Sequence, residues 1–221
     1  MPAVVEWGVR DYGESLAAMR AMVRARREGR IEDTLVLVEH PAVVTVGVEG
    51  DDGGAAGSGL PVFAVERGGK ATYHGPGQLV GYPIVDLEFR GRDVRRFVHD
   101  VEEIVAQGVS ALGVDAGRVP GQRGVWVEGR RKIASVGIAI DHWVTFHGFA
   151  LNVDPDLTAF AKIRPCGFSP AVMTSLAQEL GRPVRLAEVR PFVIDAWTSR
   201  FAPPSPTENP SVSRGVVRSS V

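Results

Sequence analysis

The chain has 221 residues, enough for one sizeable core, and its 44% hydrophobic and 23% charged residues are typical of a soluble globular protein. Its 25 basic and 26 acidic side chains nearly cancel, which argues against nucleic acid or a membrane as partner. No run of about 18 apolar residues predicts a membrane span, and the N-terminus lacks the pattern of a signal peptide. The single cysteine, Cys166, excludes an internal disulfide and favours the cytoplasm.

The first half of the chain predicts one helix followed by several strands. An amphipathic helix begins at Asp11 or Ser15 and ends near Gly29, a suitable residue to follow a helix. Strands are expected at 34–40, 42–47, 62–65 and 79–85. Residues 51–59 are rich in Gly, Ala, Ser and Asp, and we expect a mobile loop there.

The second half predicts helices and strands that do not strictly alternate. A helix is expected at 93–112, strands at 124–127, 132–140 and 144–152, and short helices at 173–180 and 186–201. We therefore expect one α+β domain over residues 1–202, with a mixed sheet flanked by helices. Residues 203–221 are dominated by Pro and Ser and predict a disordered tail.

The segment Arg67–Gln78 is the most informative part of the sequence. Its four glycines allow the backbone to approach a ligand closely, and apolar runs flank it on both sides. A plain turn would not need Arg, Thr, Tyr, His and Gln placed around its glycines. The segment predicts a loop that cradles a ligand, and its residues fit a phosphate, a nucleotide or an acyl chain.

Cys166 and Lys132 are the candidates for covalent chemistry. Most lone cysteines are small buried hydrophobes, but Cys166 lies in a Pro-Cys-Gly turn that could present its sulfur near a helix N-terminus. Lys132 heads an apolar strand, where a solvated lysine is the simpler interpretation. The chain has three lysines and 22 arginines, and lysine, unlike arginine, can release its proton when desolvated.

Several motifs together resemble the lipoyl(octanoyl)transferase family, which is related in fold to biotin and lipoate protein ligases. They are the Arg67–Gln78 segment, Lys132-Ile133-Ala134 with Gly137, His147-Gly148 followed by Ala150-Leu151-Asn152, Pro165-Cys166-Gly167, and Glu39-His40-Pro41. They occur in the family's order and span about residues 34–180. The resemblance implies the catalytic domain fold of those ligases.

The resemblance also implies the site and the partners. Cys166 and Lys132 would form the catalytic dyad, without metal or cofactor. The implied walls of the acyl site are Arg67, Gly68, Gly69, Lys70, Ala71, Thr72, Tyr73, His74, Ser135, Val136, Gly137, Gly148, Phe149 and Ala150. The implied donor is octanoyl-acyl carrier protein. The implied acceptors are lysines on lipoyl domains of 2-oxoacid dehydrogenases and on the glycine-cleavage H protein. His74 and His147 are expected to hold loops rather than to act as bases.

Two other functions compete with octanoyl transfer. One is an ATP-dependent lipoate or biotin ligase, but the Gly-Arg-Gly-Arg run of biotin ligases and the triple glycine of lipoate ligases are absent from the sequence. The other is a module that binds lipoyl domains without catalysis. Such a relative should have lost one member of the dyad, whereas both are present here.

Overall fold

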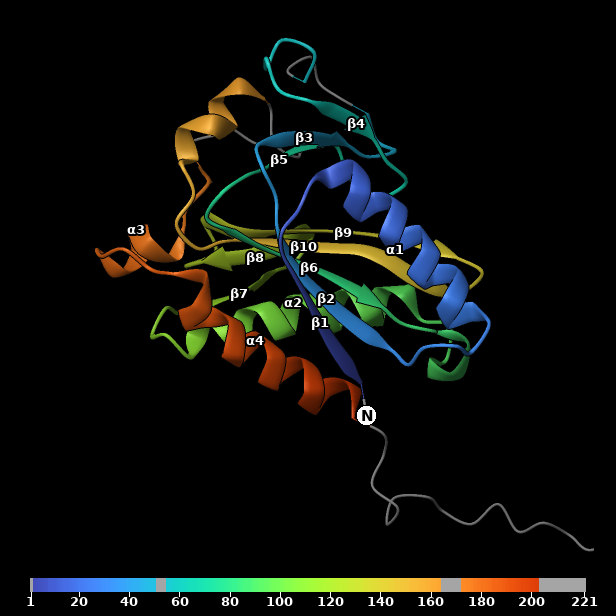
Figure 1. Cartoon of the computed structure of the whole chain (residues 1–221). Helices are drawn as coiled ribbons and strands as arrows, with labels where there is room; N and C mark the ends of the chain where they lie inside the picture. Colours follow the sequence, from blue (N-terminus) through green and yellow to red (C-terminus); the bar gives the residue numbers. More distant parts are fainter. Residues whose placement is uncertain (1, 51–54, 164–171, 203–221) are drawn as a thin grey trace, which may run out of the picture.

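The computed structural model describes residues 2–50, 55–163 and 172–202, and it forms two sheets with helices on both faces of the larger one (Figure 1). The elements in chain order are β1 (Ala3–Val9), α1 (Tyr12–Arg27), β2 (Thr34–Glu39), β3 (Val43–Val46), β4 (Val62–Ala64), β5 (Ala71–His74), β6 (Gln78–Ile84), η1 (Glu88–Arg90), α2 (Val94–Ser110), β7 (Ala116–Val119), β8 (Gln122–Val127), β9 (Arg131–Asp141), β10 (Val144–Asn152), η2 (Leu157–Lys162), α3 (Leu176–Leu180) and α4 (Leu186–Phe201).

The larger sheet is mixed, with the strand order β1-β2-β6-β10-β9-β8-β7. Its strands pair antiparallel except for β1, which runs parallel to β2. Buried side chains fill the central strands on both faces, and β2, β6 and β10 are almost entirely buried. The predicted mixed sheet flanked by helices is confirmed.

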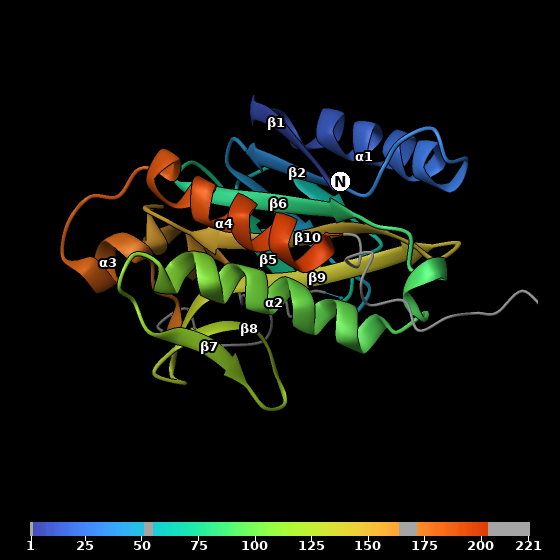
Figure 2. The same ribbon diagram turned by 90° about the horizontal axis from the view of Figure 1, so that it is seen from below.

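Helices α2 and α4 cover one face of this sheet, where they lie side by side (Figure 2). Gly108 allows their close approach, because a Cβ at this position would come within 2.6 Å of the Val193 side chain. Trp197 and Phe201 of α4 are buried in the core between these helices and the sheet. Helix α1 packs on the opposite face, with Met19 fully buried against the sheet. Each face of the sheet therefore has its own hydrophobic core.

A small sheet of order β4-β3-β5 lies on the α1 side of the molecule (Figure 1). Strand β5 corrects the expectation of a loop throughout Arg67–Gln78, because Ala71–His74 pairs antiparallel with β3. A third core cluster packs against β5, and it includes Phe160 of η2 and Met173. In the loop expected at 51–59, Ala55 and Ser58 are buried, whereas 51–54 lie outside the described residues.

Local signals explain most element boundaries. Asp11 and Asp93 accept hydrogen bonds from the backbone N–H groups of Glu14 and Arg96, and these caps begin α1 and α2. Ser175 caps α3 in the same way, so the helix predicted from 173 begins only at Leu176. Strands β1 and β7 are edge strands that the sequence pattern did not predict. No helix in the described ranges is long and apolar enough to cross a membrane.

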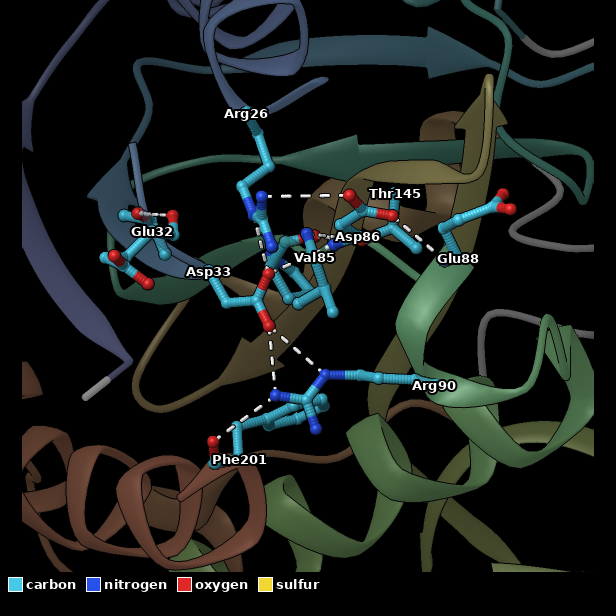
Figure 3. Close-up of polar contacts among 11 residues, drawn as sticks. Arg26, Glu32, Asp33, Val85, Asp86, Glu88, Arg90, Thr145 and Phe201 are labelled. Carbon is cyan, nitrogen blue, oxygen red and sulfur yellow. Dashed lines mark hydrogen bonds and ion pairs between the residues drawn. The ribbon is translucent and has the colours of Figure 1, made fainter. Parts of the chain in front are cut away.

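A group of charged residues ties the end of the large sheet to the helices (Figure 3). This Asp33 cluster consists of Asp33, Arg26, Asp86 and Arg90. Asp33 accepts from Arg26 Nε at 2.8 Å, from Arg90 Nη2 at 3.0 Å and from the Asp86 backbone N–H at 3.1 Å. Arg90 also lies over the Phe201 ring at the end of α4. The Asp33 carboxylate, just before β2, thus joins α1 to η1, and Arg90 extends these contacts to the end of α4.

Candidate active site

A cavity of about 270 Å³ lies between the segment Arg67–Gln78, which we call the Gly-rich segment, and strands β9 and β10 of the large sheet. We call it the central cavity. Its described lining residues are Tyr12, Glu49, Arg67, Gly68, Gly69, Lys70, Thr72, His74, Val80, Tyr82, Gly121, Gln122, Arg123, Lys132, Ser135, Val136, Gly137, His147, Gly148, Phe149 and Ala150. The position agrees with the general preference of ligand sites for concave, partly apolar pockets.

Arg67 holds the Gly-rich segment in shape. Its guanidinium donates to the carbonyl oxygens of Gly68 and Lys70, and to both the carbonyl and hydroxyl oxygens of Thr45 at 2.8 Å. The backbone N–H of Gly68 donates to the Ile138 carbonyl of β9 at 3.0 Å. Arg67 is 7% exposed, and its guanidinium donates hydrogen bonds to the protein's own oxygen atoms. It therefore shapes the cavity wall.

Glycines in β9 and β10 make room for the cavity. Gly137 and Gly148 are cross-strand partners. A Cβ on Gly137 would come within 2.9 Å of the Gly68 carbonyl oxygen, and a Cβ on Gly148 within 2.0 Å of the Gly81 carbonyl oxygen. Real Cβ atoms do not approach so closely, so both positions require glycine for the backbone contacts that surround the cavity.

Lys132 enters the cavity from a bulge in β9. Val125 of β8 pairs with Ala134, but Trp126 pairs with Lys132, so β9 has an extra residue at this point. The extra residue interrupts the alternation of the strand and lets Lys132 share the cavity with Ser135 and Gly137. Lys132 is 2% exposed, and its Nζ lies 5.3 Å from the centre of the Trp126 ring. A long cationic side chain is thus largely withdrawn from water.

The chain that follows the Pro-Cys-Gly motif is fixed to Lys132 and its neighbour. The Thr174 backbone N–H donates to the Lys132 carbonyl oxygen at 3.0 Å. Arg131 forms a bidentate salt bridge with Glu179, with N···O distances of 2.8 and 2.9 Å. Glu179 also accepts a hydrogen bond from the Thr174 hydroxyl at 2.6 Å. The Arg131 pairing lowers the pKa of Glu179. Cys166 itself lies outside the described residues.

His147 lines the cavity in an unusual backbone conformation. Its φ is +56° although it is not glycine, and its side chain is 2% exposed. Its Nε2 lies 3.3 Å from Glu66 Oε2, where it donates as Nε2–H, and Glu66 also accepts from Arg20 Nε at 3.0 Å. Burial lowers the pKa of His147 to about 4, against the partial compensation of Glu66. The imidazole is therefore neutral near pH 7.

The rings of Tyr12, His74 and Tyr82 line one part of the cavity, and His40 contacts all three. His40 Nε2 accepts a hydrogen bond from the Tyr82 hydroxyl at 2.7 Å, and His40 Nδ1–H donates to the Arg10 carbonyl oxygen at 2.7 Å. Tyr12 stacks on His74 at 6.0 Å between ring centres. Burial raises the pKa of Tyr12 to about 12 and lowers that of His74. These rings therefore carry no charge near neutral pH, which suits the end of an apolar chain.

The structure brings most of the predicted wall residues together around Lys132. Ala71 and Tyr73 are the exceptions, because successive side chains of β5 point to opposite faces. Thr72 and His74 face the cavity, whereas Ala71 and Tyr73 pack into the third core cluster, where Tyr73 contacts Phe160. The wall residues that were not predicted are Tyr12, Glu49, Val80, Tyr82, Gly121, Gln122, Arg123 and His147. His147 lies within one of the motifs that carry the family resemblance, but nothing in the local sequence marks Tyr12.

Comparison with known families identifies the domain that contains this site. The lipoyl protein ligase A/B catalytic domain family matches residues 11–198, which is most of the chain. The chain belongs to this family. The match includes the Gly-rich segment and both members of the predicted dyad, so the whole candidate site lies within the family domain.

Close relatives within the family are octanoyltransferases. One from Mycobacterium bovis (strain BCG / Pasteur 1173P2) is 47% identical over 195 residues, covering 87% of this chain and 84% of the relative. One from Acidothermus cellulolyticus (strain ATCC 43068 / DSM 8971 / 11B) is 45% identical over 212 residues, covering 94% and 96%. The predicted resemblance to the lipoyl(octanoyl)transferases is confirmed.

A solved structure shows the same fold. The crystal structure of lipoate-protein ligase A bound with ATP has a TM-score of 0.74 to this chain and covers 90% of it and 85% of the ligase chain. The sequence identity is 18%, so this likeness concerns the fold alone. It confirms the predicted relation to the catalytic domain of lipoate ligases.

Proposed function

We propose that this family member transfers an octanoyl group from a carrier-bound thioester to a lysine amine on proteins that carry lipoyl groups. The identity to octanoyltransferases over most of the chain supports this activity. The donor would be octanoyl-acyl carrier protein, and the acceptors lipoyl domains of 2-oxoacid dehydrogenases and the glycine-cleavage H protein. The reducing cytoplasm would keep the single cysteine as a thiol.

The environment of Lys132 is the observation that carries this proposal. Lys132 is buried in the central cavity. Its carbonyl oxygen accepts a hydrogen bond from the backbone N–H of Thr174, which follows the Pro-Cys-Gly motif in the chain. On the other side of the motif, Ile163 packs with Met173 in the third core cluster. The described residue before the segment that contains Cys166 thus packs with one that follows the segment, and the chain that follows it is hydrogen-bonded to Lys132. This supports a pairing of Cys166 with Lys132.

The first step would move the octanoyl group to the enzyme. A thiol with a pKa of about 8.5 is mostly protonated at neutral pH, and a nearby cation such as Lys132 favours the thiolate. The Cys166 sulfur would attack the thioester carbonyl, forming a new C–S bond while the bond to the pantetheine sulfur breaks. The departing thiolate would take a proton from Lys132. One thioester replaces another, so the step requires no ATP.

The second step would form the amide. The acceptor amine nitrogen would attack the octanoyl carbonyl, and the bond to the Cys166 sulfur would break as the C–N bond forms. Lys132, neutral after the first step, would accept the proton that the amine loses. The octanoyl tail would occupy the cavity toward Tyr12 and Tyr82. Each methylene withdrawn from water would contribute about 0.8 kcal/mol to binding.

An ATP-dependent ligase is the rival activity, since the lipoate-protein ligase A structure has the same fold and is bound with ATP. The two differ in what they require. A ligase needs nucleotide and no nucleophilic cysteine, whereas a thioester transferase needs the cysteine and no nucleotide. Amide formation on a lipoyl domain that strictly required ATP would exclude the proposal.

Intact-mass measurement after mixing with octanoyl-acyl carrier protein tests the proposal directly. The wild-type protein should gain one octanoyl increment that hydroxylamine removes, and addition of a lipoyl domain should move the increment to that domain. Cys166→Ser should show no hydroxylamine-sensitive increment. An unchanged wild-type mass, with the donor intact and the protein folded, would overturn the proposed mechanism.

A further inference from the structure

A second and larger cleft adjoins the central cavity. It has a volume of about 710 Å³ and lies between the first half of α2 and the turn that joins β7 to β8, with β9 as its floor. It shares six lining residues with the central cavity, namely Gly68, Gly121, Gln122, Arg123, Val136 and Gly137. A molecule in this cleft would therefore lie directly beside the wall of the cavity that holds Lys132.

Arginines give this cleft its charge. Arg95, Arg118 and Arg123 line it, and Glu102 is the acidic residue among its described walls. The Glu102 carboxylate is 5% exposed and is already engaged, because it accepts from Arg118 Nε and from the Gly124 backbone N–H, both at 2.7 Å. Arg123 pairs with Glu49 at the rim, 2.9 Å away. The cleft thus presents a cationic surface to an incoming molecule.

Arg95 is the residue of this group that is most available to a ligand. It is exposed on the first turn of α2 and forms no ion pair with any described residue. Val94 and Val98 lie on the same helix face and give the cleft an apolar side next to the arginine. A flexible chain with an anionic group at one end matches this combination of surfaces.

We propose that this cleft, with Arg95, binds the phosphopantetheine arm of the donor carrier protein and leads its thioester to the central cavity; this rests on the proposed function. The phosphate would lie near Arg95, where its charge is favourable, and the pantetheine chain would run along the cleft. The acceptor fits this cleft less well, because a lysine side chain is cationic in solution and is repelled by lining arginines. The arm also requires room beyond the central cavity.

Arg95→Glu and Arg96→Glu form a matched pair for testing this assignment. Both residues are exposed in the first turn of α2 and change the net charge equally, but Arg96 does not line the cleft. Both variants should fold, because acidic residues near a helix N-terminus are favourable. The measurement is the rate constant for loading the enzyme, using octanoyl-acyl carrier protein, octanoyl-phosphopantetheine and octanoyl-pantetheine as donors.

Arg95→Glu should slow loading from the two phosphorylated donors by about tenfold, the effect of losing one good ionic contact. Loading from octanoyl-pantetheine should stay within about twofold, as should all three reactions of Arg96→Glu. Equal loss with every donor, loss with the carrier-borne donor alone, or an effect on the lipoyl-domain step instead would overturn the assignment. Wild-type protein that loads from none of the donors would refute the proposed function and this inference with it.

Discussion

The Asp33 cluster and the central cavity both bury polar groups in this molecule, but they treat charge in opposite ways. In the cluster, the Asp33 carboxylate is 11% exposed and accepts from two arginines and a backbone N–H. In the cavity, Glu49 at the exposed rim is the acidic residue among the described walls, and the buried histidines have lowered pKa values. The cluster neutralises its charges by pairing, whereas the cavity keeps its buried rings uncharged.

This difference separates structural from chemical uses of burial. Paired charges that join several elements stabilise the arrangement of those elements, and they leave no group available for a ligand. Uncharged rings and glycines around one buried lysine create a space that can accept an apolar chain and hold a proton carrier next to it. Changes in the cavity should therefore affect catalysis or the pH dependence of stability, and changes in the cluster should affect stability at neutral pH without affecting catalysis.

Lys132→Met should produce the largest effect. Methionine retains an unbranched apolar stem for packing against Trp126 but cannot carry or accept a proton. Loss of a group that transfers protons lowers rates by about 10²- to 10⁴-fold, so kcat/KM for octanoyl transfer should fall within this range. Arg130→Met, which removes a cation with 80% side-chain exposure, is the control. Retention of more than about a tenth of the activity would contradict the proposed role of Lys132.

Acid should destabilise the folded protein, because His147 is buried in its neutral form. Its pKa is about 4 in the folded protein against an ordinary value of 6.5, because burial disfavours the imidazolium. The unfolded chain therefore takes up the proton first as the pH falls, and stability is lost between about pH 6.5 and pH 4. The drop in pKa corresponds to about 3 kcal/mol. The lowered pKa values of His40 and His74 act in the same direction.

His147→Asn and His142→Asn form a matched pair for this measurement. Both histidines have a positive φ, which asparagine tolerates, but the His142 side chain is 66% exposed. Urea unfolding at pH 7 and pH 4.5 should show a smaller acid loss for His147→Asn than for the wild type. His142→Asn should follow the wild type. Equal pH dependence in all three proteins would show that burial of His147 is not linked to stability.

The sequence carries most of the fold in local signals. Asp93 and Ser175 mark helix starts through their caps, and the alternation in 132–140 marks β9. The motifs also locate most of the cavity wall. Gly137 and Gly148, for example, stand where any side chain would collide with the backbone of a neighbouring segment. These features can be predicted because each depends on residues close in sequence.

Features that depend on distant residues could not be predicted. Edge strand β1 is half exposed and pairs on one side within the described sheet, so its sequence lacks the strong pattern of a buried strand. The place of Tyr12 in the cavity follows from how α1 packs on the sheet. The bulge that brings Lys132 into the cavity arises from the register between β8 and β9. None of these leaves a signal in the neighbouring residues.

Asp33→Asn should test whether the Asp33 cluster contributes to stability without affecting catalysis. The amide retains the shape of the carboxylate but leaves Arg26 and Arg90 without their shared anion. Loss of such a partly buried set of charged hydrogen bonds should cost about 2 kcal/mol of unfolding free energy. Urea unfolding measures it, with Glu28→Gln in an exposed pair as control. Octanoyl transfer at a permissive temperature should stay within about twofold, and a much larger loss of kcat would mean that the cluster is coupled to the cavity.

The Glu49–Arg123 pair at the cavity rim should give the smallest effect. It is an ion pair, like those of the Asp33 cluster, but it lies beside the central cavity. Glu49 accepts from the Gly69 backbone N–H at 3.0 Å and from Arg123 at 2.9 Å, and these bonds lower its pKa. The two side chains are 46% and 59% exposed, so solvent screens them. Glu49→Gln should change the unfolding free energy by less than about 0.5 kcal/mol at low salt. The change should vanish near 1 M salt, where charges are screened beyond about 3 Å. A loss comparable to that of Asp33→Asn, unaffected by salt, would place the rim with the Asp33 cluster as a structural element and not with the cavity.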